Sequence, residues 1–191
     1  MAERRGLDVD VYQPAEDSGL LARAATEDGR LGPDDVALEV GTGSGWVAAT
    51  VAEETGARTL GSDVNPHAAE QARERGVEAL RADLVSPVRD GALDAVLFNP
   101  PYLPTDPENE WSDWMERALS GGESGRALID PFLDSVGRVL APDGAVYLLV
   151  SSLTGFDEVV ARAAENGFAV ETVVQESYPF ETLSVLRLTS E

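Results

Sequence analysis

The residues most clearly arranged for chemistry form the tetrapeptide Asn99-Pro100-Pro101-Tyr102, which directly follows an apolar segment. Consecutive prolines fix the backbone φ angle and remove two N–H donors, so carbonyl oxygens are left free to accept hydrogen bonds. The Asn99 side chain and the Pro100 carbonyl would then offer two rigid acceptors to a planar NH2 group, on which Tyr102 would stack. Such a frame positions a weak nitrogen nucleophile with its lone pair pointing outward, and it needs no general base. The structural alternative is a rigid proline turn capped by asparagine.

A glycine loop, Gly41-Thr42-Gly43-Ser44-Gly45, joins the short segment 36–40 to a helical pattern. Glycines let the backbone turn sharply and approach a ligand closely. Asp63 closes the next apolar segment eighteen residues after Gly45, and a carboxylate there suits the two hydroxyls of a ribose. We therefore expect a cofactor that contains a nucleoside, with a tight strand-to-helix turn as the alternative.

The charge at Glu39 narrows the choice of cofactor. NAD would place its pyrophosphate on the glycine loop and the start of the helix, where Glu39, two residues before Gly41, would repel it. S-adenosylmethionine carries an ammonium and a sulfonium group instead, and a carboxylate complements both. Glu39 thus favours S-adenosylmethionine over NAD. Asp83-Leu84, at the end of a third apolar segment, could hold the adenine, or could be only a strand-end turn.

The elements that must position these residues alternate along the chain. Apolar segments predict strands at residues 36–40, 59–62, 77–82, 93–98, 145–150, 169–174 and 182–188. Helical spacing predicts helices at 18–26, 47–54, 65–75, 126–140 and 157–166. Residues 103–125, rich in Pro, Gly, Trp and acids, are predicted to form a loop. Its length favours a lid over the substrate, although Trp111 and Trp114 could simply anchor a long loop.

This alternation predicts one α/β domain over residues 1–191, with 1–30 forming a loop and helix over the cofactor. We expect a doubly wound, mostly parallel seven-stranded sheet with helices on both faces. The last two strands are joined by Tyr178-Pro179 with no helix between them, so they should form an antiparallel hairpin at one edge. Ligands of such sheets bind at the carboxyl ends of the strands, where every candidate residue falls.

Composition limits the environment and the partners. The 191 residues carry 35 acidic and 14 basic side chains, a net charge of −21, and every basic residue is arginine. Acids spread along the whole chain favour a protein of a salt-loaded cytoplasm over one that binds basic partners, and they make nucleic acid an unlikely ligand. Cysteine is absent and His67 is the single histidine, so we expect no metal site. No signal peptide or membrane span is expected.

Taken together, these motifs resemble those of the HemK-type release-factor glutamine methyltransferases, in particular the short archaeal and eukaryotic branch. Beside the glycine loop, Asp63 and the Asn-Pro-Pro-Tyr element, the resemblance rests on residues 12–18 (YQPAEDS), on Gly121-Gly122 with Gly125-Arg126, and on residues 129–132 (IDPF). It covers roughly residues 10 to 190 and implies a Rossmann-like class I methyltransferase.

The resemblance implies a cofactor, a substrate and the residues that hold them. Asn99, Pro100 and Tyr102 would hold the target amide, the glutamine of the Gly-Gly-Gln loop of a class 1 release factor. The residues implied to contact S-adenosylmethionine are Ser18, Glu39, Gly41, Gly43, Asp63, Asp83, Leu84 and Asn99.

The resemblance also implies a partner. Only about ten residues precede Tyr12, so we expect no N-terminal docking domain of the kind that bacterial relatives carry. Short relatives instead pair with a small zinc-binding activator, which would contact the sheet edge near residues 77–80 and form a heterodimer.

Other functions remain open at this point. The Asn-Pro-Pro-Tyr element is shared with adenine-N6 methyltransferases of DNA or RNA, against which the acidity counts, and lysine methylation could use the same site. A catalytically silent binding module and a nicotinamide-dependent reductase are further alternatives.

Overall fold

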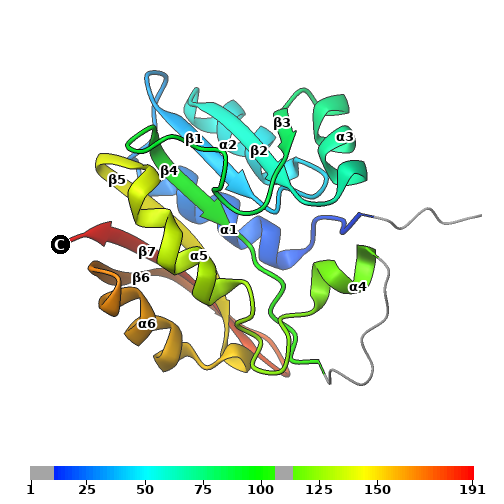
Figure 1. The fold of residues 1–191 in the computed structure, drawn as a ribbon, viewed down its shortest axis with the longest axis vertical. Helices are drawn as coiled ribbons and strands as arrows, with labels where there is room; N and C mark the ends of the chain where they lie inside the picture. The colour runs from blue at the N-terminus through cyan, green and yellow to red at the C-terminus, as the bar shows by residue number, and fades with distance from the viewer. Residues whose placement is uncertain (1–10, 106–113) are drawn as a thin grey trace, which may run out of the picture.

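The computed structural model describes residues 11–105 and 114–191. Seven strands form a single sheet with helices on both faces (Figure 1). The strands are β1 (Val36–Val40), β2 (Arg58–Asp63), β3 (Glu78–Arg81), β4 (Leu93–Phe98), β5 (Leu140–Ser151), β6 (Phe168–Ser177) and β7 (Thr182–Ser190). The helices are α1 (Glu16–Glu27), α2 (Trp46–Thr55), α3 (Pro66–Glu74), α4 (Trp114–Leu119), α5 (Ile129–Val136) and α6 (Phe156–Glu165).

The sheet has the order β3-β2-β1-β4-β5-β7-β6. Neighbours from β3 to β5 pair in parallel, whereas β7 runs antiparallel to both β5 and β6. The predicted doubly wound sheet with an antiparallel C-terminal hairpin at its edge is therefore confirmed. The chain changes direction across the sheet between β1 and β4, and this switch point opens a crevice at the carboxyl ends of those strands.

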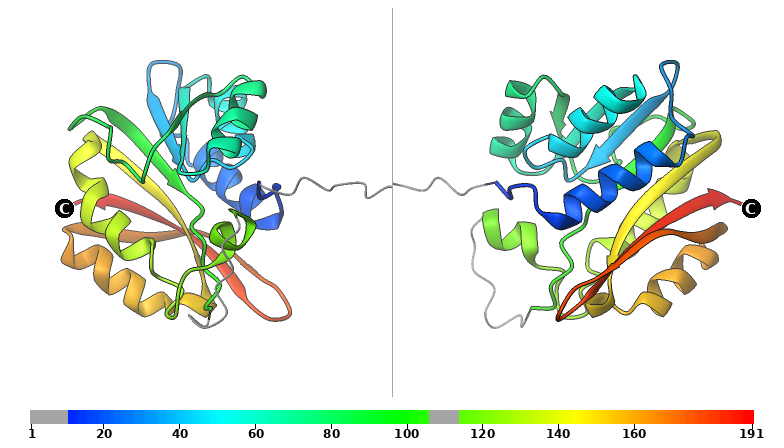
Figure 2. Two further views of the ribbon diagram at one scale, coloured as in Figure 1. Left: turned by 45° about the vertical axis from the view of Figure 1, so that its right-hand side comes forward. Right: turned by 180° about the vertical axis from the view of Figure 1, so that it is seen from behind.

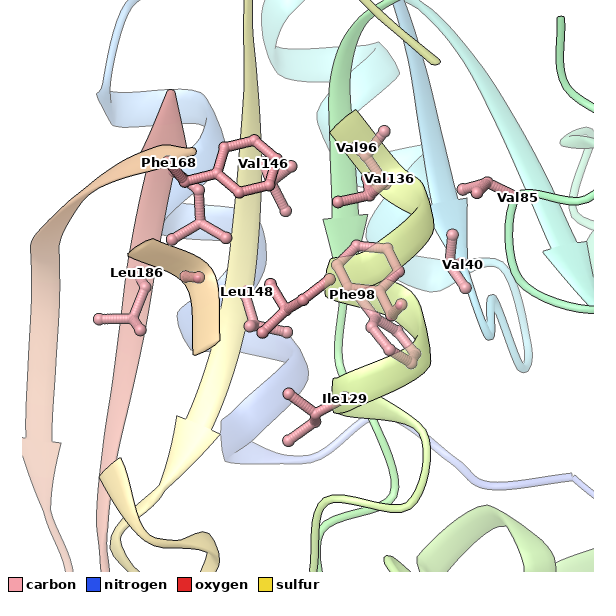
Figure 3. Close-up of a cluster of buried hydrophobic side chains, with 14 of the residues drawn as sticks. Val40, Val85, Val96, Phe98, Ile129, Val136, Val146, Leu148, Phe168 and Leu186 are labelled. Atoms are coloured by element: carbon pink, nitrogen blue, oxygen red, sulfur yellow. The ribbon is translucent and has the colours of Figure 1, made fainter. Parts of the chain in front are cut away.

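Two helical layers bury the two faces of the sheet. On one face α5 and α6 cover a core that includes Val96, Phe98, Val146 and Leu148 (Figure 3). On the other face α1 and α2 cover the alternate side chains of the same strands (Figure 2), because successive residues of a strand point to opposite faces. α3 packs beside α2 and over β2 and β3.

The predicted helix at 126–140 is wrong at its ends. α5 spans only Ile129–Val136 and is followed by a 3-10 turn, Gly137–Val139. The chain then enters β5 at Leu140, which pairs with Leu93, and the N–H groups of Gly91 and Ala92 donate to the carbonyls of Arg138 and Val139. These contacts with the start of β4 satisfy the backbone hydrogen-bonding groups of residues 138–140. The helix therefore ends before them, although the apolar spacing of the sequence continues.

The predicted loop at 103–125 also differs, because it contains the short helix α4. A β-bridge joins Leu103, at the start of this segment, to Ser120, which follows α4.

Within residues 11–105 and 114–191, no helix is both long and apolar enough to cross a bilayer.

Candidate active site at the carboxyl edge of the sheet

A cavity of about 610 Å³ lies at the carboxyl ends of β1, β2 and β4, a size typical of small-molecule sites. The structure brings together all ten residues predicted from sequence along its wall: Ser18, Glu39, Gly41, Gly43, Asp63, Asp83, Leu84, Asn99, Pro100 and Tyr102. They come from five separate regions of the chain. Their individual contacts with ligands stay predictions.

The glycine loop turns from β1 into α2 beside this cavity. Gly41, Gly43 and Gly45 have φ angles of 64°, 52° and 75°, in the left-handed region that favours glycine. A Cβ atom added to Gly45 would lie 2.8 Å from the Cβ of Ala72, so glycine is required where α2 approaches α3. The N–H of Gly43 donates to Asp63 Oδ2 at 3.0 Å, which ties the loop to the end of β2.

Glu39 is the most deeply buried acid of the site, with only 4% of its surface exposed. Its Oε2 accepts from Thr42 Oγ1 at 2.7 Å and from the N–H of Ala48 at 2.9 Å. Burial raises the pKa of Glu39 to about 8, although both hydrogen bonds oppose this shift. An uncompensated carboxylate in such a place is costly, and a bound cation beside it would restore its charge.

The raised pKa predicts a pH-dependent affinity for the cationic cofactor. The free protein holds a proton on Glu39 that the unfolded chain has lost, so the free energy of unfolding falls as pH rises toward about 8. A bound cation stabilises the carboxylate, so binding expels that proton. Between pH 6 and 7.5 the affinity for S-adenosylmethionine should rise by up to about tenfold per pH unit.

Isothermal titration calorimetry in buffers of different ionisation enthalpy would measure this proton release. A Glu39→Gln variant should bind more weakly and release no proton. Equal proton release by the variant and the wild type would contradict the assignment.

Asp63 and Leu84 complete the wall on the side of β2 and β3. Asp63 Oδ1 accepts from the N–H of Asn65 at 2.9 Å. Burial raises the pKa of Asp63, whereas its backbone hydrogen bonds lower it. Leu84 has a φ of 47°, which is rare for a residue other than glycine and typical of functional sites. Asp83, next to it, is exposed and lines the cavity.

The Asn99 carboxamide is held in one orientation. Its Nδ2 donates to Asp17 Oδ2 at 3.0 Å, so its Oδ1 is the free acceptor. Oδ1 is buried and, among the described residues, has no hydrogen-bond partner. A buried acceptor without a partner carries a substantial free-energy cost, which a ligand N–H would remove.

Asp17 is the functional residue that sequence reasoning missed. It is 5% exposed and lies on α1, 82 residues from Asn99. Its Oδ2 also accepts from the Tyr12 hydroxyl at 3.1 Å, and its Oδ1 accepts from the N–H of Ser18 at 2.6 Å. A buried carboxylate this well bonded fixes the side chain that it contacts, so Asp17 positions Asn99. The only sequence signal was its place in the 12–18 motif.

Tyr102 lies beside this pair and is half-buried. Burial and the negative charges of Glu181 and Asp17 raise its pKa, so the phenol is neutral. A Cβ atom added to Gly125 would lie 2.8 Å from the Tyr102 carbonyl, and Gly125 has a φ of 74°. Glycine at 125 therefore allows the chain after Asn-Pro-Pro-Tyr to pack closely.

The segment predicted as a lid is tied at its base. Leu103 forms two backbone hydrogen bonds with the residues that follow α4. Its N–H donates to the Leu119 carbonyl at 3.0 Å, and its carbonyl accepts from the Gly121 N–H at 2.9 Å. The Thr105 N–H donates to the Gly122 carbonyl at 3.0 Å. Trp114 and Arg117 of α4 line the cavity, with the guanidinium carbon 5.1 Å from the Trp114 ring centroid. Trp111, the other tryptophan of the predicted lid, lies outside the described residues.

The polar side chains of the wall decide which ligands the cavity fits. Over residues 11–105 and 114–191, His, Asp and Glu side chains form no group of three that could hold a metal ion. The wall instead offers a carboxylate for a cation at Glu39 and an oriented acceptor at Asn99.

Comparison with known proteins identifies this chain as similar to methyltransferases. The sequence family described as "Methyltransferase domain" matches residues 37–122. The chain is 35% identical to a candidate protein N5-glutamine methyltransferase of Methanocaldococcus jannaschii, over 93% of this chain and 90% of that one. It is 34% identical to the human methyltransferase HEMK2, over 97% and 92% of the two chains.

A solved structure extends the likeness to three dimensions. Mtq2 from the E. cuniculi Mtq2-Trm112 complex is 29% identical to this chain. The superposition covers 95% of this chain and 99% of that one, with a TM-score of 0.79. Identity at this level over nearly the whole length of these relatives shows that the chain belongs to the HEMK2 and Mtq2 family of S-adenosylmethionine-dependent protein N5-glutamine methyltransferases.

Proposed function

We propose that this enzyme methylates the side-chain nitrogen of the glutamine in the Gly-Gly-Gln loop of a class 1 translation release factor. The observation that carries the proposal is the buried Asn99 Oδ1, which lacks a partner in the described structure and is aimed by Asp17. An amide NH2 group is the donor that it fits. The E. cuniculi relative is described as responsible for methylation of the eRF1 translation termination factor.

The chain's own residues divide the task between cofactor and substrate. When bound, S-adenosylmethionine supplies a methyl group activated by the sulfonium charge. Glu39 offers the buried carboxylate for its positive charge. Asn99 Oδ1 and the Pro100 carbonyl accept the two amide hydrogens, which leaves the nitrogen lone pair directed at the methyl group, and Tyr102 stacks on the amide plane. Catalysis then comes from orientation of the two reacting groups, and the amide nitrogen loses one of its two protons during or after its attack on the methyl group.

We further propose a heterodimer with a small zinc-binding activator. The E. cuniculi relative was solved in complex with Trm112. In this chain β3 is an edge strand of the sheet, and among the described strands it pairs only with β2. An unpaired edge readily accepts another chain, so the activator is proposed to contact residues 77–80.

Peptide mass spectrometry tests the substrate. The protein would be co-produced with its activator and incubated with S-adenosylmethionine and the full-length release factor of the same cell. One added methyl on the glutamine of Gly-Gly-Gln is expected, and none in a release factor with Gly-Gly-Ala. Methylation of a lysine in place of that glutamine would reject the proposal, as would methyl transfer to an added oligonucleotide in a parallel reaction that leaves the glutamine unmodified.

We also propose that the protein works in a cytoplasm of high salt, where its net charge of −21 is screened. Its melting temperature should then fall as potassium chloride is reduced from about molar to millimolar concentrations, because mutual repulsion of the carboxylates grows. Sucrose at equal osmolality is the control for a general effect of solutes. A melting temperature that does not change with salt would contradict this proposal.

A further inference from the structure

The turn between β6 and β7 presents an aromatic ring to solvent. Phe180 is 93% exposed, whereas the next most exposed large apolar residue described is Leu153 at 44%. An exposed phenylalanine forgoes the free energy that burial of its ring would supply. Leu153 belongs to the 3-10 turn Ser152–Thr154 after β5, which contacts the same hairpin. We name Phe180 and Leu153 together the rim surface.

The turn is held rigidly. The Tyr178 N–H donates to the Glu181 carbonyl at 2.7 Å, and the Tyr178 hydroxyl donates to Glu176 at 2.9 Å. Ser151 Oγ donates to the Glu181 carboxylate at 2.6 Å, and Ser152 Oγ accepts from the N–H that follows the turn at 3.0 Å. The backbone that carries the ring is therefore already ordered, which reduces the conformational entropy lost when Phe180 binds a partner.

The turn that carries Phe180 lies beside the active-site cavity. A recess of about 90 Å³ joins the turn to the site, because Tyr178 and Glu181 line it together with Tyr102 and Asp17. The charge of Glu181 also contributes to the raised pKa of Tyr102. Figures 1 and 2 show the hairpin tip at the end of the sheet toward which β4 and β5 run, beside the chain that follows β4.

We propose that the rim surface docks the protein substrate outside its reacting loop, with Phe180 as the anchor. This inference rests on the proposed function. A protein whose loop enters the cavity brings its flanking surface close to this turn, because Tyr178 and Glu181, on either side of Phe180, line the recess beside Tyr102. The activator is proposed at β3, at the opposite edge of the sheet from β6 and β7, so both partners can be bound at once.

Kinetics with two substrates test the docking role. The heterodimer and its Phe180→Ser and Phe180→Leu variants would methylate the full-length release factor and a short Gly-Gly-Gln peptide. For the release factor, Phe180→Ser should raise KM roughly tenfold or more, as loss of an aromatic anchor does, with kcat unchanged. Phe180→Leu should recover most of this loss. For the peptide, which cannot reach the rim, all three proteins should be equal, and their melting temperatures should agree.

The other outcomes overturn the proposal. If the wild type methylates both substrates and Phe180→Ser is equal to it on the release factor, the docking role is wrong and the proposed function stands. A KM that rises equally for peptide and protein would place Phe180 in the cavity's own function. A shift from dimer to monomer of this chain in Phe180→Ser, with an unchanged KM, would assign the rim to a second copy. Failure of the wild type on both substrates would reject the proposed function and this inference with it.

Discussion

Replacement of Asn99 by alanine should lower kcat by about two to three orders of magnitude, the loss seen when one oriented polar group is removed from a catalytic site. The variant lacks the buried Oδ1 acceptor, so the substrate amide loses one of its two fixed partners. Single-turnover transfer of a labelled methyl group, at saturating substrate and cofactor, measures this loss directly.

A matched control for this prediction is Asn166→Ala. Asn166 is an exposed asparagine after α6, and its removal should leave kcat unchanged. Since Asn99 also lines the cofactor cavity, the affinity for S-adenosylmethionine should be measured in parallel and should fall much less than kcat. An Asn99→Ala enzyme with wild-type kcat would refute the role given to this side chain.

The change Asp17→Asn should lower kcat by roughly ten- to a hundredfold although the side chain keeps its size. One carboxylate oxygen faces Asn99 Nδ2 and the other faces the N–H of Ser18. An amide has only one oxygen, so one of these donors must meet an NH2 group, and an unsatisfied buried donor costs about 1–3 kcal/mol. The Asn99 carboxamide then no longer holds its oxygen toward the substrate.

A double-mutant cycle separates this positioning role from a general loss of structure. Asp17→Asn should add almost nothing to the loss already caused by Asn99→Ala, since both act on the same acceptor. Tyr12→Phe removes a different hydrogen bond from the same Asp17 oxygen and should have the smaller effect. If the losses of kcat from Asp17→Asn and Asn99→Ala were additive in the double variant, Asp17 would act on a group other than Asn99.

Local patterns, together with the family resemblance, were sufficient to predict the sheet and ten of the residues that line the cavity. The glycine loop, a strand-end acid such as Asp63 and the Asn-Pro-Pro-Tyr element can each be identified from a few consecutive residues. Parallel strands then bring their carboxyl ends, and these residues with them, to one edge of the sheet. The contact between Asp17 and Asn99 could not be predicted in this way, because it joins residues 82 positions apart and depends on how α1 packs over the sheet.

The two errors about helices have different origins. The apolar spacing from Leu128 to Val136 favoured a helix that continued to Leu140, yet pairing of Leu140 with Leu93 ends it earlier. Helix α4 was missed because its six residues lie in a segment dominated by turn-forming and acidic residues. At Leu140 a tertiary contact overrides the local preference, whereas α4 is a short local helix that its neighbours in the sequence concealed.

The hydrogen-bonded base of the segment after Tyr102 has a consequence for how this family can diversify. Because Leu103 and Thr105 are bonded to the strip from Leu119 to Gly122, the chain leaves and re-enters the domain at a fixed separation. Closing a longer insertion over the same two ends would cost little additional entropy. A different segment inserted between these two flanks would therefore leave the catalytic tetrapeptide in its place, which makes the flanks suitable points at which to engineer selectivity for a new protein.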